Sequence, residues 1–138
     1  MINAMVVTTN DKDDHVPSQL SLRRSTLQIQ LRNNYKGRRC NCSICSRKGI
    51  VNSFSYIPPE NIERVEGMSS LALYQFGDKD VNHYFCRTCG VCPFTTVASV
   101  PPDYVGPARP GYYRINLGCI ENIDVYGLEI EVIDGRSL

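Results

Sequence analysis

The chain has 138 residues, a formal net charge of +1 and an ordinary hydrophobic content of 42%. It contains no run of the ~18 apolar residues that a membrane span requires, and its first residues lack the basic region of a secretory leader. These features predict one soluble cytoplasmic domain with a core of its own and no membrane partner.

The first 20 residues show no hydrophobic period, so residues 1–20 are expected to be a flexible leader and residues 21–138 the folded domain. We assign no ligand role to His15 in this leader. The alternation in Leu27–Leu31 predicts a half-buried strand. A turn follows at residues 33–37, and Ile50–Tyr56 predicts the next strand. Residues 59–65 are compatible with one helical turn.

The second half of the chain predicts a β-hairpin followed by further strands. Residues 71–76 and 81–85 alternate around the turn at 77–80, so the second arm delivers Cys86 to its end. Proline and glycine predict an irregular loop at 101–111. Three more segments read as strands, namely residues 93–97, 112–117 and 128–133. Because no segment sustains a helical period, the predicted class is mainly β.

Seven cysteines in a chain without a leader are expected to be thiols or thiolates in a reducing compartment. Three of them, Cys40, Cys42 and Cys45, form a C-x-C-x-x-C run. Cys86 and Cys89 form a distant C-x-x-C turn. Turns of this kind present sulfur ligands to one point, and zinc is the expected occupant.

Two arrangements of these thiols are compatible with their spacing. A closed structural site would use Cys42, Cys45, Cys86 and Cys89, which is the more common use of two cysteine turns. Cys40 would then be a spare thiol. Alternatively, Cys40 joins Cys42 and Cys45 in a site with an open position for chemistry, so one or two zinc ions per chain are expected.

Three further residues are given structural roles. Cys92 is a spare ligand or a buried small side chain, and Pro93 beside it favours burial. Cys119 is expected in the core, and His83 is expected to be a packed or surface imidazole rather than a ligand.

The charges are unevenly distributed. The segment from Arg23 to Lys48 contains eight basic residues and no acidic one, and this excess could focus an anion near the first cysteine run. Aromatic residues are not interleaved with these charges except at Tyr35, so the sequence does not favour a nucleic-acid partner.

At these same residues the sequence resembles the glutathione-dependent formaldehyde-activating enzyme family, which includes centromere protein V. The resemblance covers roughly residues 25–138. It is carried by the two cysteine motifs, Tyr74–Gly77, Tyr113–Cys119 and Val132–Gly135. It implies small antiparallel sheets that form a zinc-bearing β-tent.

The resemblance also implies roles for the cysteines. Cys40, Cys42 and Cys45 correspond to the catalytic metal site, and Cys86 and Cys89 correspond to half of a structural site. In the family, an N-terminal Cys-x-Cys completes that structural site. Here Leu22–Arg24 or residues near it stand in its place, and no cysteine precedes Cys40.

Two functions therefore remain open. The first is a zinc-dependent carbon-sulfur lyase or synthase that joins glutathione and formaldehyde into S-hydroxymethylglutathione. In this hypothesis Arg38, Arg39, Arg47 or Lys48 meets the carboxylates of glutathione. The second is a zinc-stabilised binding module without turnover, which is favoured by the missing N-terminal cysteine pair.

Overall fold

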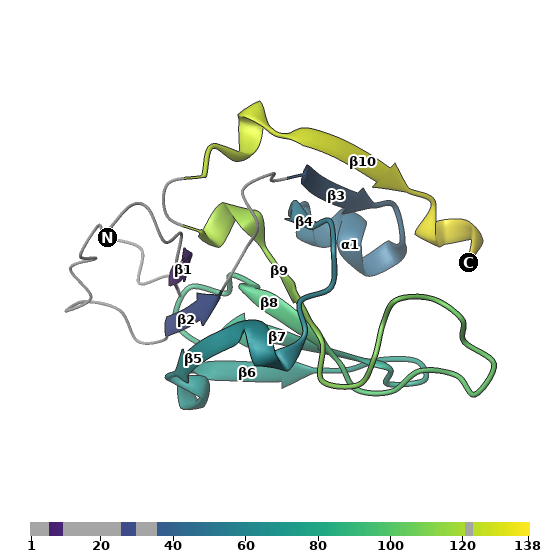
Figure 1. Ribbon diagram of the computed structural model, residues 1–138, viewed down its shortest axis with the longest axis horizontal. Helices are drawn as coiled ribbons and strands as arrows, with labels where there is room; N and C mark the ends of the chain where they lie inside the picture. Colours follow the sequence, from purple (N-terminus) through teal and green to yellow (C-terminus); the bar gives the residue numbers. More distant parts are fainter. Residues whose placement is uncertain (1–5, 10–25, 30–35, 121–122) are drawn as a thin grey trace.

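The computed structural model describes residues 6–9, 26–29, 36–120 and 123–138. Within these ranges the chain is mainly β, with small sheets, one short α-helix and several 3-10 turns. Figure 1 shows the strands β3, β4 and β10 with helix α1 in one layer and the strands β5 to β9 in another. The predicted class is confirmed at this level.

The largest sheet has the order β6-β7-β8-β9, and every pairing in it is antiparallel. Its strands are β6 (Leu71–Tyr74), β7 (Val81–Cys86), β8 (Phe94–Val97) and β9 (Tyr113–Ile115). The predicted hairpin is confirmed, since Leu71 pairs with Cys86 and Tyr74 with His83. Gly77 adopts a φ of 55° in the turn between the two arms, a conformation that glycine tolerates best.

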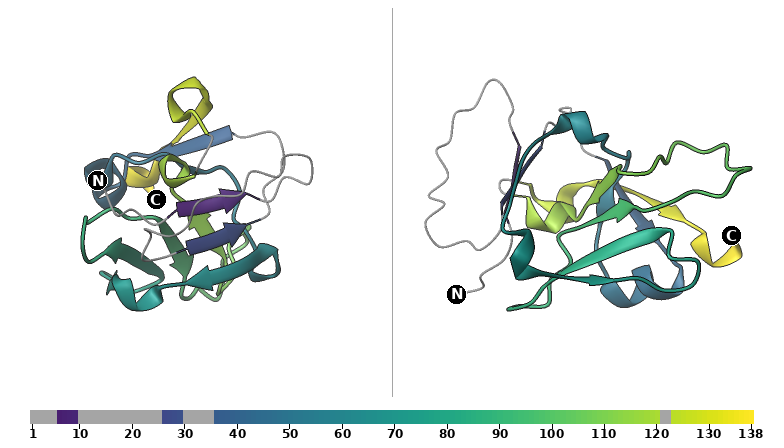
Figure 2. Two further views of the ribbon diagram at one scale, coloured as in Figure 1. Left: turned by 90° about the vertical axis from the view of Figure 1, so that its left-hand side faces the viewer. Right: turned by 90° about the horizontal axis from the view of Figure 1, so that it is seen from below.

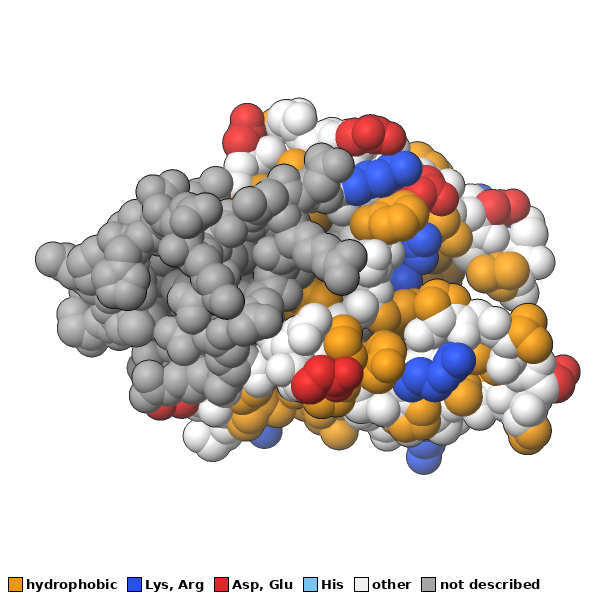
Figure 3. Space-filling model, in the orientation of Figure 1, with side chains coloured by type: hydrophobic (Ala, Val, Ile, Leu, Met, Phe, Trp, Pro, Cys, Tyr) orange, Lys and Arg blue, Asp and Glu red, His pale blue; other side chains and the backbone are white. Residues whose placement is uncertain are grey.

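A second sheet holds the first cysteine run and has the order β10-β3-β4. Its strands are β10 (Glu129–Ile133), β3 (Lys36–Cys40) and β4 (Asn52–Ser53). Gly37 is required in β3, because a β-carbon there would overlap the side chains of Val51 and Ile130. Beside it, Lys36 pairs with Glu129 and Glu131, and Figure 3 shows basic and acidic side chains adjoining along the upper edge of this face.

The third sheet has the order β1-β2-β5. Its strands are β1 (Val6–Thr9), β2 (Thr26–Ile29) and β5 (Ile62–Glu66), which lie side by side in the left view of Figure 2. Strand β1 belongs to the segment expected to be a leader, and the rest of that segment, with His15 and Leu22–Arg24, lies outside the described residues.

Helix α1 spans Ser43–Lys48 and ends at Gly49, whose left-handed φ of 63° lets its amide bond the carbonyl of Cys45. The 3-10 turns are η1 (Pro59–Asn61), η2 (Met68–Ser70), η3 (Leu117–Cys119), η4 (Val125–Gly127) and η5 (Gly135–Ser137). Turn η1 falls where a helical turn was predicted. No helix in the described ranges is long and apolar enough to cross a membrane.

The core joins the two main sheets. Phe94, Ile115 and Leu117 are at most 1% exposed, and each such side chain contributes about 1.5–3 kcal/mol through burial. Isolated β-bridges between Asn52 and Asn116 and between Ile57 and Tyr113 connect the segment after α1 to β9. This packing fixes the first cysteine run relative to the larger sheet.

The structure corrects several expectations. Two strand pairings, β1 with β2 and β10 with β3, are parallel, whereas small antiparallel sheets were expected. The expected turn at residues 33–37 is in part strand β3, and the expected strand over Ile50–Tyr56 is reduced to β4. Neither α1 nor β5 was predicted.

Candidate metal centre

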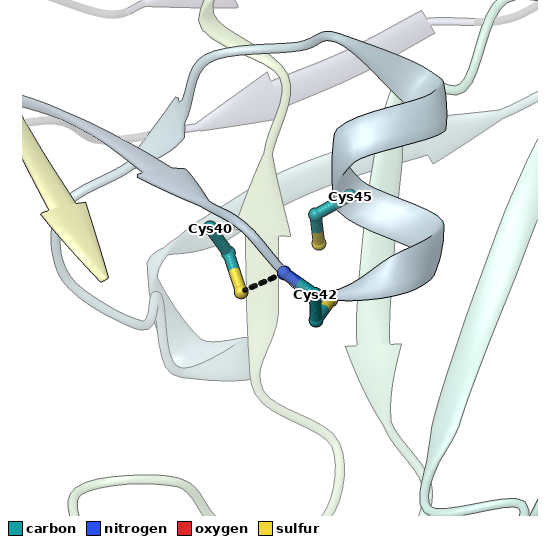
Figure 4. A group of neighbouring side chains, drawn as sticks. All are labelled: Cys40, Cys42 and Cys45. Carbon is teal, nitrogen blue, oxygen red and sulfur yellow. Dashed lines mark hydrogen bonds between the residues drawn. The ribbon is translucent and has the colours of Figure 1, made fainter. Parts of the chain in front are cut away.

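Strand β3 and helix α1 bring three sulfurs to one place. Cys40 ends β3, Cys42 is the N-cap of α1, and Cys45 lies three residues further on the same side of the helix. Their three Sγ atoms lie within 4.8 Å of one another, and Figure 4 shows them facing a common point. The backbone amide of Cys42 also donates to the Sγ of Cys40 at 3.4 Å. We call these three residues the thiol cluster.

The C-terminal turn supports the thiol cluster. The side chain of Asn41 donates to Asp134 at 2.7 Å and accepts from the amide of Arg136 at 2.9 Å. The amide of Asn41 donates to the carbonyl of Ile133 at 3.1 Å. The right view of Figure 2 shows the C-terminal end of the chain beside α1. The loop that carries Cys40 and Cys42 is therefore held from outside as well as by its own helix.

The thiols of the cluster differ in their acidity. Burial, followed by the thiols of Cys42 and Cys40, raises the pKa of Cys45 to about 12. Burial also acts to raise the pKa of Cys42, but the backbone amides of Cys45 and Ile44 and the neighbouring thiols outweigh it, so this pKa is lowered. Without a metal, Cys45 therefore keeps its proton at neutral pH.

The donor set suits zinc. Sulfurs bound at about 2.3 Å to a tetrahedral ion lie about 3.8 Å apart, so the spacing of the thiol cluster needs little adjustment. Three thiolates leave the fourth position of a tetrahedron open. The thiol cluster could thus hold one metal ion with a position for a further ligand.

The thiol cluster opens onto a cavity of about 670 Å³. All three cysteines line it, together with basic side chains, aromatic rings and His83. This volume is in the range of pockets that bind small molecules. The open position of a bound metal would thus be accessible to a substrate.

A second polar group in the cavity joins α1 to β7. The Nζ of Lys48 lies 3.0 Å from the Nδ1 of His83 and 3.6 Å from the Sγ of Cys92. Burial, and then the charge of Lys48, lowers the pKa of His83 to about 4, so its ring is neutral at physiological pH. His83 is 5% exposed, in agreement with the packed imidazole expected from the sequence.

The structure separates the four basic residues proposed to meet a carboxylate. Arg38 and Lys48 line the cavity, whereas Arg39 and Arg47 are exposed outside it. Sequence reasoning missed Arg114, which also lines the cavity. Its signal was the alternation in strand β9, where Tyr113 and Ile115 face the core and Arg114 must face the other way.

The second cysteine motif lies on a different turn, after β7. Cys86 is 4% exposed, Cys89 is partly buried, and neither belongs to the thiol cluster. Among the described residues, no third ligand atom completes a group with these two. The residues that the structure describes therefore do not fit a second, closed four-ligand site.

The two other cysteines are largely buried. Burial, with smaller contributions from Cys92 and Cys89, raises the pKa of Cys119 to about 12. Burial also raises the pKa of Cys92, whose thiol donates to the carbonyl of Phe94. Both thiols are protonated at neutral pH, and Cys119 packs against the core.

The fold and the sequence of this chain are similar to those of known proteins. A crystal structure of a Rhodobacter sphaeroides protein from structural genomics matches with a TM-score of 0.59 and 28% sequence identity, over 79% of this chain and 90% of that one. The sequence model described as glutathione-dependent formaldehyde-activating enzyme matches residues 24–130, a range that includes all five cysteines of the two motifs. The chain belongs to the glutathione-dependent formaldehyde-activating enzyme family.

Proposed function

We propose that this protein reversibly joins a small thiol such as glutathione to formaldehyde, as a zinc-dependent carbon-sulfur lyase or synthase. In this proposal Cys40, Cys42 and Cys45 hold one zinc ion per chain. The observation that carries the proposal is the convergence of three sulfurs, within 4.8 Å of one another, at the wall of a cavity of about 670 Å³.

Three ligands beside a cavity suit chemistry better than a structural role. Structural zinc sites are closed by four protein ligands, whereas catalytic sites keep one position for water or substrate. A bound zinc ion would lower the pKa of a thiol that enters this position, so that thiolate is present at neutral pH.

The reaction needs no redox partner. The thiolate sulfur adds to the carbonyl carbon, the carbon-sulfur bond forms, and the carbonyl π electrons move to oxygen, which then takes a proton. The reverse reaction breaks the same bond and returns the proton. Lys48 lines the same cavity as the thiol cluster, and its ammonium group would supply positive charge and a proton to the developing oxyanion.

Zinc content and turnover test the proposal together. Zinc-loaded protein is expected to contain one ion per chain and to accelerate the exchange between S-hydroxymethylglutathione and its components, measured by NMR exchange spectroscopy. Cys45→Ser is expected to bind zinc more weakly and to lose the acceleration. Cys119→Ser is the matched control, because Cys119 lies outside the thiol cluster and does not line the cavity.

The alternative function predicts a different result. A zinc-stabilised binding module would bind one ion and unfold on chelation, but it would not accelerate the exchange over buffer. Zinc binding with no acceleration would therefore refute the enzymatic proposal and support the module.

A further inference from the structure

Two arginines in the cavity have donor groups that the described protein does not use. The Nε of Arg38 is shielded from solvent and has no hydrogen-bond partner among the described residues. Buried donors without a partner are uncommon because they lose their hydration without compensation. A ligand acceptor at this position would restore the missing bond.

Arg114 lies on the same cavity and is held in a fixed orientation. Its Nη1 donates to the carbonyls of Ser53 at 3.0 Å and Phe54 at 3.3 Å. No ion pair to Arg114 or to Arg38 is found in the described part of the chain. Two guanidinium groups therefore line one cavity without a described carboxylate in ion-pair contact with either of them, and the nearest described acidic influence on Arg38 is the charge of Glu131 on the paired strand β10.

Aromatic rings orient both guanidinium groups. The Cζ of Arg38 lies 4.8 Å from the ring centroid of Phe54, and the Cζ of Arg114 lies 4.0 Å from that of Tyr56. Stacking of this kind leaves the in-plane N–H groups available for hydrogen bonds. Those planar donors match the two oxygens of a carboxylate better than they match a spherical anion.

The backbone places these donors close to the thiol cluster. Arg38 and Cys40 are two residues apart in β3, so their side chains share one face and their Cα atoms are separated by about 7 Å. The acidic residues of the cavity, Asp78 and Asp80, come from another element, the turn between β6 and β7. Arg38 and Cys40 therefore line the same wall of the cavity.

We infer that Arg38 and Arg114 form a subsite for a carboxylate of the substrate. The assignment of the ligand as a thiol rests on the proposed function. The carboxylate subsite itself does not require turnover, and it can be tested by binding alone.

The test uses S-methylglutathione, which keeps the carboxylates but has a blocked thiol, and its dimethyl ester, in which the carboxylates are neutral. Both are titrated calorimetrically into the zinc-loaded protein. The acid is expected to bind at least about tenfold more tightly than the ester, as a lost charged hydrogen bond predicts. Equal affinities would overturn the inference.

Variants locate the subsite. Arg38→Gln and Arg114→Gln are each expected to reduce binding of the acid about tenfold or more, towards the affinity of the ester. Arg114→Gln also removes two hydrogen bonds to backbone carbonyls, so a loss of binding in this variant could reflect a structural change. Arg38→Gln is therefore the decisive variant, because the Nε of Arg38 has no hydrogen-bond partner among the described residues. Arg47→Gln is the matched control, since Arg47 is exposed and does not line the cavity. Unchanged binding in Arg38→Gln would refute the subsite.

The two proposals fail in distinguishable ways. If the wild type binds S-methylglutathione through these arginines but does not accelerate the exchange reaction, the enzymatic proposal fails and the subsite stands. If exchange is accelerated but Arg38→Gln keeps full affinity, the subsite fails and the enzymatic proposal stands. Inorganic phosphate that competes as strongly as a carboxylate would overturn the assignment of the ligand class.

Discussion

Gly135 of the C-terminal turn packs directly against the sulfur of Cys40. A β-carbon at Gly135 would overlap that sulfur and would lie 3.2 Å from the Cβ of Cys42. The last turn of the described chain and the first cysteine run thus share one packed volume, although they are separated by most of the sequence.

Gly135→Ala is expected to displace Cys40 and to weaken zinc binding at least about tenfold, because overpacking a close contact costs ~1–3 kcal/mol. Competition with a chromogenic chelator measures this loss. Gly118→Ala is the control, since it adds the same methyl group against the end of the Asn116 side chain, away from the thiol cluster. Equal zinc affinities of Gly135→Ala and the wild type would contradict the packing argument.

Asn41 is expected to stabilise the loop that carries the thiol cluster. Asn41→Ala removes the bonds to Asp134 and to the amide of Arg136, and we expect a loss of about 1 kcal/mol in the free energy of unfolding. Urea denaturation of the metal-free protein measures this change. Ser137→Ala, which removes another hydrogen bond to Asp134 but none to the loop, should leave zinc affinity unchanged, whereas Asn41→Ala should lower it.

Zinc binding is expected to release protons, because thiolate is the ligand form of cysteine. The pKa of Cys45 is raised to about 12, so its proton is present at neutral pH and must leave when the ion binds. Calorimetry in buffers with different ionisation enthalpies counts the released protons. Cys45→Ser should release about one proton fewer than the wild type. An identical count in both proteins would show that Cys45 is not a ligand.

The thiol cluster could be predicted because its geometry is local. Cys42 follows Cys40 by two residues, and Cys45 follows Cys42 by three. This spacing brings the three sulfurs together in most compact turns, whatever surrounds them. The surrounding elements were less predictable. Helix α1 has six residues, too few to show a helical period, and β3 consists largely of glycine and basic residues without apolar alternation.

The cavity could not be predicted, because it depends on contacts between distant segments. The alternation of residues in strand β9 predicts that the side chain of Arg114 faces away from the core. The sequence does not predict which surface this side chain lines. Its neighbours in the cavity come from β3, α1 and β7, and their arrangement follows from β-bridges and core packing around Ile115. The parallel pairing of β10 with β3 likewise joins two ends of the domain.

His83 makes stability depend on pH in a defined direction. Its pKa is about 4 in the folded chain and 6.5 in its ordinary state, so the unfolded chain binds more protons between these values. The contribution of His83 to the free energy of unfolding is fully present above pH 6.5 and is lost as the pH decreases towards 4. Allowing for partial solvent screening, we expect a loss of about 1–2 kcal/mol across this window.

Urea denaturation of the metal-free wild type and His83→Gln at several pH values isolates this contribution, because protonation of other groups affects both proteins equally. The difference between them should shrink as the pH falls. Lys48→Met provides an independent check: the charge of Lys48 contributes to the lowered pKa of His83, so its removal should shift the NMR titration of the imidazole upward. A folded wild type in which His83 titrates near 6.5 would show that the ring is neither buried nor in contact with Lys48.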